Sequence, residues 1–262
     1  MTVLVVGAGI AGLCAALALR PHAEVLVLER RSHVAANAGA GIQLSPNAIK
    51  ALDVIGAREV VEAHSTAPRG LHIGAAGRRA PLAEIDYGLM EKRFGAPYRT
   101  ASRAGLHEAL LIAAAQAGIT ICFDTTVDTL EPSGTGWVIP DAGAGDRGGI
   151  SARNGGIAPL VIAADGVSSA LRQRMLDDTP TETGACAWRG TAPMAEGESS
   201  FTRLTLSRQC HLVRYVLPDA RDNAVFVSSL SRPPANLGDN PITTALTGVS
   251  QWVPWPIKVQ PK

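Results

Sequence analysis

The chain has 262 residues, a formal net charge of +1, and 46% hydrophobic against only 4% aromatic residues. A chain of this length can bury one large core or two smaller ones, and its balanced charge argues against a nucleic-acid partner or an anionic-membrane surface. Its four cysteines are far apart, with no CxxC pair and no histidine at zinc-site spacing, so we expect neither a disulfide framework nor a metal site.

The start of the chain and its apolar runs predict a cytoplasmic protein. Met1 and Thr2 lead directly into the apolar run Val3–Val6, without the basic region that opens a signal peptide. No later apolar run approaches the roughly 20 residues that a membrane span requires. The sparse cysteines fit a reducing compartment.

The first thirty residues predict a βαβ unit. Residues 3–6 are a short apolar run rich in valine, and a glycine cluster follows them. Residues 13–19 are apolar and rich in alanine, as in a helix, which Pro21 ends. A second apolar run, residues 25–28, ends at Glu29. The order of strand, glycine turn, helix and strand is typical of a parallel sheet.

The rest of the chain predicts mixed elements and then a β-rich part. Residues 47–52 and 106–116 have helical apolar spacing, and residues 70–86 predict two strands around a turn at 74–77. Residues 134–156 predict exposed hairpin loops before the apolar run at 160–163. Beyond Asp178 the apolar runs are short, as in strands, and the proline-rich tail from Trp252 predicts no helix.

A GxGxxG pattern, formed by Gly7, Gly9 and Gly12, lies between the first predicted strand and helix. Gly7 permits a tight turn, Gly9 lets the backbone approach a pyrophosphate, and Gly12 lets the helix pack closely on the strand. The helix N-terminus offers free N–H groups to phosphates. Glu29, at the end of the second strand, can accept hydrogen bonds from both ribose hydroxyls of an adenosine. The alternative is a structural turn and a surface glutamate.

A second match to the same pattern, at residues 143–148, is expected to be a loop. It has no strand before it and no helix after it. A glycine pattern without these neighbours cannot present a helix N-terminus to a phosphate. The first match therefore carries the prediction of a dinucleotide site.

Three further segments distinguish FAD from NAD as the dinucleotide. Residues 39–48, which include Gly41, resemble the class A flavoprotein monooxygenases, in particular the salicylate-hydroxylase-like group. Residues 98–110 are similar to the family segment whose arginine lies by the FAD pyrophosphate and ribityl chain, and Arg103 takes that place. Residues 164–172 resemble the second family fingerprint, in which Asp165 would bind the ribityl hydroxyls. The resemblance assigns FAD binding to Gly7, Gly9, Gly12, Glu29, Arg30, Gly41, Arg103 and Asp165.

Arg103 also has a structural interpretation, and two residues near Asp165 have supporting roles. Arg103 could instead form a surface salt bridge at the start of a helix. In the second fingerprint, the resemblance gives Ser169 and Arg172 the role of supporting the turn and the approach of nicotinamide. Ala163 stands where the family usually has glycine, so one close backbone contact is expected to differ slightly.

Two predicted strands in the second half resemble the family's substrate domain. Trp188-Arg189-Gly190 resembles its first strand, and His211-Leu-Val-Arg-Tyr215 resembles its HxVxY strand. His211 and Tyr215, four positions apart, share one face of a strand, roughly 13 Å apart. In relatives acting on hydroxybenzoates the matching residues line the substrate pocket and assist phenol activation, a role that suits histidine. The alternative is a structural hydrogen bond for His211 and a core position for Tyr215.

The resemblance implies an α/β fold with two interleaved parts. These are a Rossmann-like FAD-binding domain of the glutathione-reductase type, residues 1–68 and 98–177, and a β-rich substrate domain, residues 69–97 and 178–262. The implied reaction is the hydroxylation of a small aromatic, hydroxybenzoate-like substrate by oxygen and FAD reduced with NADH or NADPH. A homodimer is a candidate assembly.

The end of the family pattern has no counterpart in this sequence. Family members continue into a GDAAHxxxP motif and long helices, whereas here the letters GD occur only at Gly238-Asp239, in an expected loop. We therefore expect a C-terminally truncated chain in which the flavin ring is exposed to water. The reduced flavin would then pass its electrons to oxygen and release hydrogen peroxide instead of hydroxylating the substrate. The alternatives are an FAD-binding remnant without turnover and an NAD-dependent dehydrogenase. Arg103 and the segment around Asp165 argue against the dehydrogenase.

Overall fold

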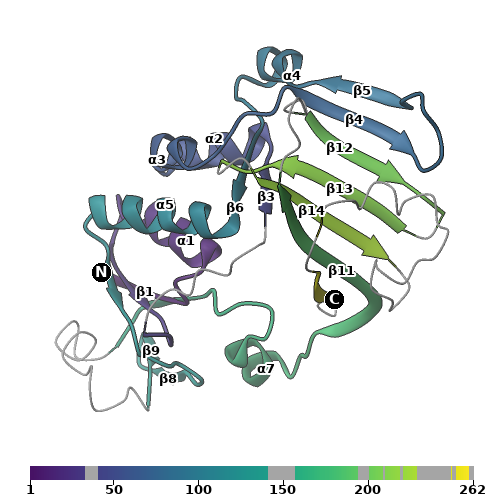
Figure 1. Ribbon diagram of the computed structural model, residues 1–262. Coiled ribbons are helices and arrows are strands. Elements are labelled where there is room, and N and C mark those ends of the chain that lie inside the picture. Colours follow the sequence, from purple (N-terminus) through teal and green to yellow (C-terminus); the bar gives the residue numbers. More distant parts are fainter. Residues whose placement is uncertain are drawn as a thin grey trace.

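The N-terminal part of the molecule contains the parallel βαβ unit that the sequence predicts (Figure 1). The computed structural model describes residues 1–32, 41–140, 157–193, 201–208, 210–218, 221–228, 249 and 252–259, without side chains at 193 and 221–228. A four-stranded parallel sheet consists, in spatial order, of β10 (Leu160–Ala163), β1 (Thr2–Val6), β2 (Glu24–Leu28) and β7 (Thr120–Cys122). The helix α1 (Ile10–Leu19) connects β1 to β2.

Both faces of this parallel sheet are buried. On one face, Val5 belongs to a core cluster with Leu13 of α1 and residues of α5 (Arg103–Gln116). On the other face, Leu4 belongs to a second cluster, which includes Leu171. Strands that are buried on both sides have continuous apolar runs instead of alternating ones, which explains the sequence of β1 and β2.

Two short helices and a small sheet follow β2. The helices are α2 (Pro46–Val54) and α3 (Arg58–Ala63), and the small sheet pairs β3 (Gly41–Leu44) antiparallel with β6 (Arg99–Ser102). Pro46 lies in the first turn of α2, where a missing N–H breaks no helical hydrogen bond. β6 leads directly into α5.

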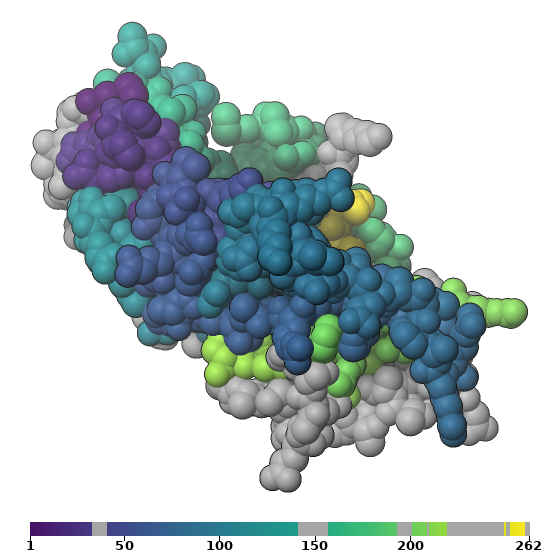
Figure 2. Space-filling model, turned by 90° about the horizontal axis from the view of Figure 1, so that it is seen from above, coloured from purple at the N-terminus to yellow at the C-terminus, as the bar shows by residue number. Residues whose placement is uncertain are grey.

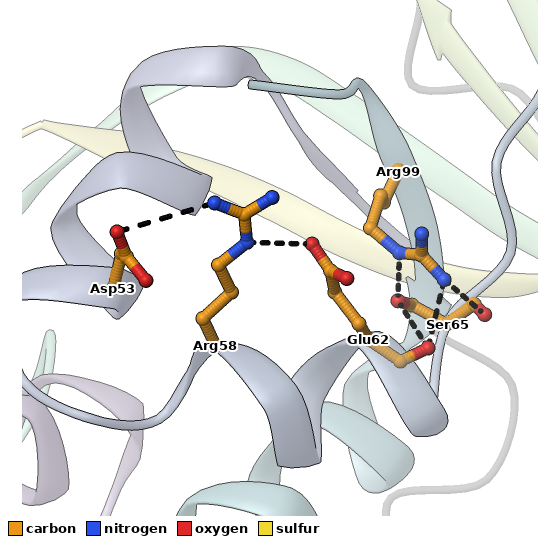
Figure 3. A network of polar contacts seen from close by, with 5 residues as sticks. All are labelled: Asp53, Arg58, Glu62, Ser65 and Arg99. Carbon is orange, nitrogen blue, oxygen red and sulfur yellow. Dashed lines mark hydrogen bonds and ion pairs between the residues drawn. The ribbon is translucent and has the colours of Figure 1, made fainter. Parts of the chain in front are cut away.

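Arg99 on β6 fixes the C-terminal end of α3 (Figure 3). Its guanidinium donates hydrogen bonds to the Glu62 carbonyl oxygen (2.7 Å), the Ser65 hydroxyl (2.6 Å) and the Ser65 carbonyl oxygen (3.0 Å). Carbonyl groups at a helix C-terminus lack partners within the helix, so Arg99 satisfies them. Arg58 extends the network to Glu62 (2.8 Å) and Asp53 (3.9 Å). The network anchors the strand that precedes α5.

A seven-stranded sheet forms the other part of the molecule (Figure 1). Its neighbouring strands are antiparallel, except that β12 and β4 are parallel. Its spatial order is β15 (Val253–Val259), β11 (Thr181–Pro193), β14 (Arg221–Ser228), β13 (Cys210–Val216), β12 (Phe201–Leu206), β4 (Gly70–Ala75) and β5 (Ala83–Asp86). The chain enters this sheet twice, before β6 and after α7 (Ala170–Leu176). The expected interleaving is confirmed, while the exact domain limits stay a prediction.

Several local details go beyond the sequence expectations. β4 and β5 are separated by residues 76–82, a longer connection than the predicted turn at 74–77. The helix α4 (Tyr87–Phe94) follows, begun by the Asp86 side chain, which accepts a hydrogen bond from the Leu89 N–H, and ended by Gly95 with a φ of 71°. These are ordinary capping signals that could have predicted it. A small hairpin joins β8 (Glu131–Ser133) to β9 (Gly136–Val138).

The proline-rich tail forms the edge strand β15. An edge strand tolerates proline because one row of its N–H groups pairs with nothing. Parts of three sequence patterns lie outside the described residues: 39–40, 143–148 and 238–239. Within the described ranges, no helix is long and apolar enough to cross a membrane, and no cluster of three His, Cys, Asp or Glu residues could hold a metal ion.

The two parts of the molecule meet at β6 and β13. Thr100 is completely buried, and its hydroxyl donates a 2.6 Å hydrogen bond to the carbonyl oxygen of Val216. The backbone of Thr100 also exchanges two 2.8 Å hydrogen bonds with that of Thr66. In Figure 2 the blue part of the chain, which includes α2, α3 and α4, extends across one face of the molecule. The junction therefore contains specific polar contacts.

Candidate functional site

The loop between β1 and α1 has the geometry that its glycines predict. Gly7 has a φ of +103°, and a Cβ there would lie 2.5 Å from the carbonyl oxygen of Ala164. A Cβ on Gly12 would overlap the carbonyl oxygen of Gly7, whereas a Cβ on Gly9 would meet no protein atom within 4 Å. The fold therefore requires Gly7 and Gly12, and Gly9 leaves its backbone open to a ligand.

A cavity of about 530 Å³ lies beside this loop. It is lined by residues at the carboxyl ends of β1, β2 and β10 and at the N-terminus of α1. Gly9, at the N-cap of α1, makes no side-chain capping bond, so the helix offers N–H donors and its positive dipole end to an anion. Six of the residues predicted to bind FAD line this cavity: Gly7, Gly9, Glu29, Arg30, Arg103 and Asp165.

Glu29 is held in place by two backbone N–H groups, one in the glycine loop and one just after β2. One carboxylate oxygen accepts a 2.8 Å hydrogen bond from the Ala8 N–H, and the other accepts a 3.1 Å bond from the Arg31 N–H. A carboxylate oxygen has lone pairs for more than one donor, so both remain able to accept a ribose hydroxyl. Glu29 thus stabilises the glycine loop through Ala8, and its carboxylate can accept further hydrogen bonds in the cavity.

Arg103 and Arg30 bring positive charge to the cavity. Arg103 is the first residue of α5, whose start is capped by the Ser102 hydroxyl, an acceptor for the Gly105 N–H at 2.9 Å. The Arg103 side chain is exposed and has no ion pair with any described residue. A guanidinium is well suited to two parallel hydrogen bonds with a phosphate.

Asp165 follows β10 and faces the start of α7. Its Oδ2 lies 3.4 Å from the Leu171 nitrogen as an acceptor. The Ser169 hydroxyl caps α7 by accepting a 2.9 Å hydrogen bond from the Arg172 N–H, and the Arg172 side chain pairs with Asp178, with 2.7 Å between Nε and Oδ2. Ser169 thus caps α7 shortly after Asp165, whereas the Arg172 side chain contacts Asp178 beyond the end of α7, and their predicted support of the turn stays a prediction.

His107 lines the cavity although the sequence analysis assigned it no site role. Its Nε2 lies 2.6 Å from the Ala8 carbonyl oxygen. A carbonyl oxygen only accepts, so Nε2 carries the proton. His107 and Glu29 together hold both backbone polar groups of Ala8, in the middle of the glycine loop. The sequence spacing could have predicted this position, because His107 follows Arg103 by four residues and therefore lies on the same face of the helix.

Gly12 and Gly41 do not line the cavity. Gly12 lies beneath it, where α1 packs on the loop. Gly41 is opposite Ser102 in the β3–β6 pair, beside the start of α5. Both lie next to cavity residues, and their predicted contact with FAD stays a prediction.

His211 and Tyr215 lie on β13, outside this cavity. Tyr215 is only 2% exposed, whereas His211 is half-buried. Tyr87 and Tyr98 stack with their ring centroids 4.1 Å apart, and the Tyr98 hydroxyl donates a 2.7 Å hydrogen bond to the Gln43 side chain. Burial raises the pKa of Tyr98, and Tyr87 and Tyr215 raise it further, so Tyr98 stays protonated at neutral pH. The pocket roles of His211 and Tyr215 stay predictions.

The cavity groups suit a dinucleotide with a diphosphate. A fixed carboxylate, an uncapped helix N-terminus and a guanidinium without an ion pair in the described part of the chain match a ribose and two phosphates in chemistry. Among protein families, the one described as FAD binding domain matches residues 1–227. The chain belongs to this family. As a member of this FAD-binding family it has FAD as its cofactor, and the predicted fold class is confirmed.

Other proteins resemble this family member over most of its length. The 3-hydroxybenzoate 6-hydroxylase of Polaromonas naphthalenivorans is 31% identical over 249 residues, which are 91% of this chain and 59% of that protein. The 3-amino-4-hydroxybenzoate 2-monooxygenase PtnB3 of Streptomyces platensis is 32% identical over 238 residues, 88% of this chain and 57% of that protein. The chain therefore spans less than two thirds of the length of these relatives.

Solved structures have the same fold. The crystal structure of Klebsiella pneumoniae HpxO complexed with FAD and uric acid superposes with a TM-score of 0.80 at 21% identity, covering 98% of this chain and 68% of that one. At this identity the likeness concerns the fold. The predicted resemblance to the flavoprotein hydroxylases is thus confirmed by sequence and by architecture.

Proposed function

We propose that the protein is an FAD-dependent monooxygenase that hydroxylates a hydroxybenzoate-like aromatic ring, with NADH or NADPH as reductant and oxygen as co-substrate. The observation that carries the proposal is the convergence of Gly9, Glu29, Arg103 and Asp165, from separate stretches of chain, on one cavity. Two relatives whose names state hydroxylation of a hydroxybenzoate, or monooxygenation of an aminohydroxybenzoate, support the substrate class.

Each part of the cofactor has a matching group in the chain. We assign the adenosine ribose to Glu29, the pyrophosphate to the Gly9 backbone and Arg103, and the ribityl hydroxyls to Asp165. Arg30 adds positive charge at the adenosine end, and Gly41 allows a close backbone approach beside α5. When bound, FAD supplies the redox chemistry, which is hydride uptake from the reduced nicotinamide and activation of oxygen.

The chain's own task in the reaction is to hold the ring and to move a proton. His211, half-buried on β13, is our candidate acceptor for the phenolic proton, because an imidazole can exchange a proton near neutral pH. Tyr215 on the same strand face is our candidate for orienting the ring through its hydroxyl. Deprotonation of the phenol makes the ring carbons more electron-rich and therefore more reactive towards activated oxygen. A residue that takes this proton thus raises the rate of hydroxylation.

The absorbance spectrum of the purified protein, with and without added FAD, tests the cofactor assignment. We expect flavin absorbance to stay with the protein through gel filtration, and Arg103→Ala to lose it. NADH or NADPH oxidation is then measured with a panel of hydroxybenzoates, and we expect stimulation and a product heavier by one oxygen atom. Retained flavin without stimulation or product from any member of the panel would overturn the proposed activity and leave an FAD-binding protein.

The proposal extends to location and assembly. We propose a cytoplasmic protein and a homodimer of the 27.2 kDa chain. Light scattering of the eluting protein measures its mass directly, and a monomer mass at micromolar concentration overturns the dimer. Cell fractionation with the protein in the membrane or secreted fraction overturns the location.

A further inference from the structure

Arg189 lies on the same face of the seven-stranded sheet as His211 and Tyr215. On β14, position 225 is opposite Arg189 of β11, while positions 223 and 227 are opposite Tyr215 and His211 of β13. Residues directly opposite in an antiparallel pair point to the same face, and so do alternate residues along a strand. The three side chains therefore share one face, although they come from strands that are two apart in the sheet.

The separation between Arg189 and His211 suits a bound aromatic ring. The two strands are two spacings of about 4.8 Å apart, and the two residues are offset by two positions of about 3.4 Å, which gives about 12 Å between their Cα atoms. Tyr215 is offset by the same amount in the opposite direction. A long arginine side chain can reach across part of this span, which leaves room for one ring between the guanidinium and the imidazole.

Arg189 lies within electrostatic reach of a residue that lines the FAD cavity. Burial lowers the pKa of Arg189, the nearby Tyr215 opposes this change, and the positive charge of Arg103 adds to the lowering. Arg103 lines the cavity, so Arg189 feels the positive charge of a cavity residue.

Arg189 has a cationic group without an acidic partner among the described residues. Its guanidinium lies 5.0 Å from the centre of the Trp255 ring, a cation–π contact, and no described carboxylate pairs with it. Arg189 is half-buried, and a partly buried charge is costly unless something compensates it. The stacked ring also orients the guanidinium, which favours two parallel hydrogen bonds to a carboxylate.

We propose that Arg189 binds the carboxylate of an aromatic acid substrate and so directs the ring along the sheet towards His211. The inference rests on the proposed function and adds to it the residue that selects an acid over a neutral ring. A guanidinium left without its anion rejects the neutral ring in the same way that any buried unpaired polar group does.

The test is a binding measurement, independent of turnover. The FAD-loaded protein is titrated with 3-hydroxybenzoate and with 3-hydroxybenzamide, which lacks the negative charge, and the change in flavin absorbance reports each dissociation constant. We expect the wild-type protein to bind the acid at least about tenfold more tightly than the amide, as for one charge-assisted pair. Equal affinities for the two ligands would overturn the inference while leaving an aromatic-binding protein.

Substitutions of Arg189 show whether this residue causes the preference for the acid over the amide. Arg189→Gln should lose the preference for the acid, with little change in the affinity for the amide. Arg189→Lys keeps the positive charge but not the planar pair of N–H donors, so it should retain part of the preference. The control is Arg214→Gln, because Arg214 is also half-buried but points to the opposite face of the sheet, next to Tyr215 in β13. An unchanged acid preference in Arg189→Gln would overturn the inference.

Two further outcomes distinguish Arg189 from the cofactor site and from the proposed function. If Arg189→Gln loses FAD affinity but keeps the acid preference, Arg189 serves the cofactor and the inference is wrong. If the wild-type protein binds FAD but neither aromatic ligand, the proposed substrate class fails and the inference fails with it.

Discussion

The two parts of the molecule bring their site residues together in different ways. In the N-terminal part, Gly7, Gly9 and Glu29 belong to one βαβ unit, so the strand–turn–helix–strand path itself gathers them at one end of the parallel sheet. In the seven-stranded sheet, Arg189 and His211 share one face only because β14 lies between their strands and pairs with both in a particular register. A short motif determines the first arrangement, and long-range strand pairing determines the second.

This difference has a functional consequence. Cofactor-binding groups held by local geometry can be altered one at a time with effects on FAD affinity, while the sheet face can be altered with effects on the ligand alone. The two properties are separable if the junction at Thr100 and Val216 holds the parts in place independently of either site. The following variants are chosen to break or to sharpen this separation.

The largest expected effect is on folding, from Gly12→Ala. The added Cβ would overlap the Gly7 carbonyl oxygen, so we expect the free energy of unfolding to fall by about 3 kcal/mol or more. Gly9→Ala is the matched control, because its Cβ meets no protein atom and should change that free energy by less than about 1 kcal/mol. Urea unfolding measures both values.

The same pair also tests the cofactor site. Gly9→Ala places a methyl group in the cavity at the helix N-terminus, so we expect FAD to bind at least about tenfold more weakly although the protein stays folded. Normal FAD affinity in Gly9→Ala would show that the phosphates do not approach this backbone.

The next largest effect is on FAD affinity, from Arg103→Ala. Loss of a charge-assisted contact to phosphate should weaken FAD binding by about tenfold to hundredfold. His211→Ala, on the face of the seven-stranded sheet, should change it by less than about twofold, since His211 does not line the cavity. Fluorescence titration with FAD measures both variants, and equal losses in the two would contradict the separation of cofactor and substrate sites.

The sequence predicted the N-terminal site because its geometry is local. Gly7 needs a positive φ, Gly12 needs the absence of a Cβ, and Glu29 follows a strand directly, so each requirement appears as a residue type at a fixed spacing. The shared face of His211 and Tyr215 was predictable for the same reason, because two positions on one strand follow its period of two.

The remaining contacts depend on pairings that no short pattern encodes. The bond from His107 to Ala8 requires α5 to pack beside the glycine loop, and the bond from Thr100 to Val216 requires β6 to meet β13. The position of Arg189 opposite residue 225 requires the register of β11 on β14. One-residue slips in that register would turn Arg189 to the opposite face, so the sequence alone left its role undetermined.

The junction between the parts can be weakened by Thr100→Val. The variant keeps the side-chain shape but removes the donor to the Val216 carbonyl, which is then left partly buried without this partner, so we expect a loss of about 1–2 kcal/mol in unfolding free energy. Thr120→Val is the control, an exposed threonine on β7, with an expected change within about 0.5 kcal/mol. If FAD affinity in Thr100→Val stays normal while stability falls, the cofactor site does not depend on the junction.

The smallest expected effect comes from His107→Ala, which frees the Ala8 carbonyl and leaves Glu29 as the side chain that holds the middle of the glycine loop. Losing one hydrogen bond of this kind should weaken FAD binding about fivefold and speed amide hydrogen exchange in the loop. His107→Gln, which keeps an N–H donor, should recover part of the affinity. His72→Ala is the control, because that ring stacks on Phe201 in the seven-stranded sheet with centroids 4.0 Å apart. If His107→Ala and His72→Ala bind FAD equally well, the glycine loop is held by Glu29 and its own backbone, and the bond from His107 to Ala8 does not contribute to FAD binding.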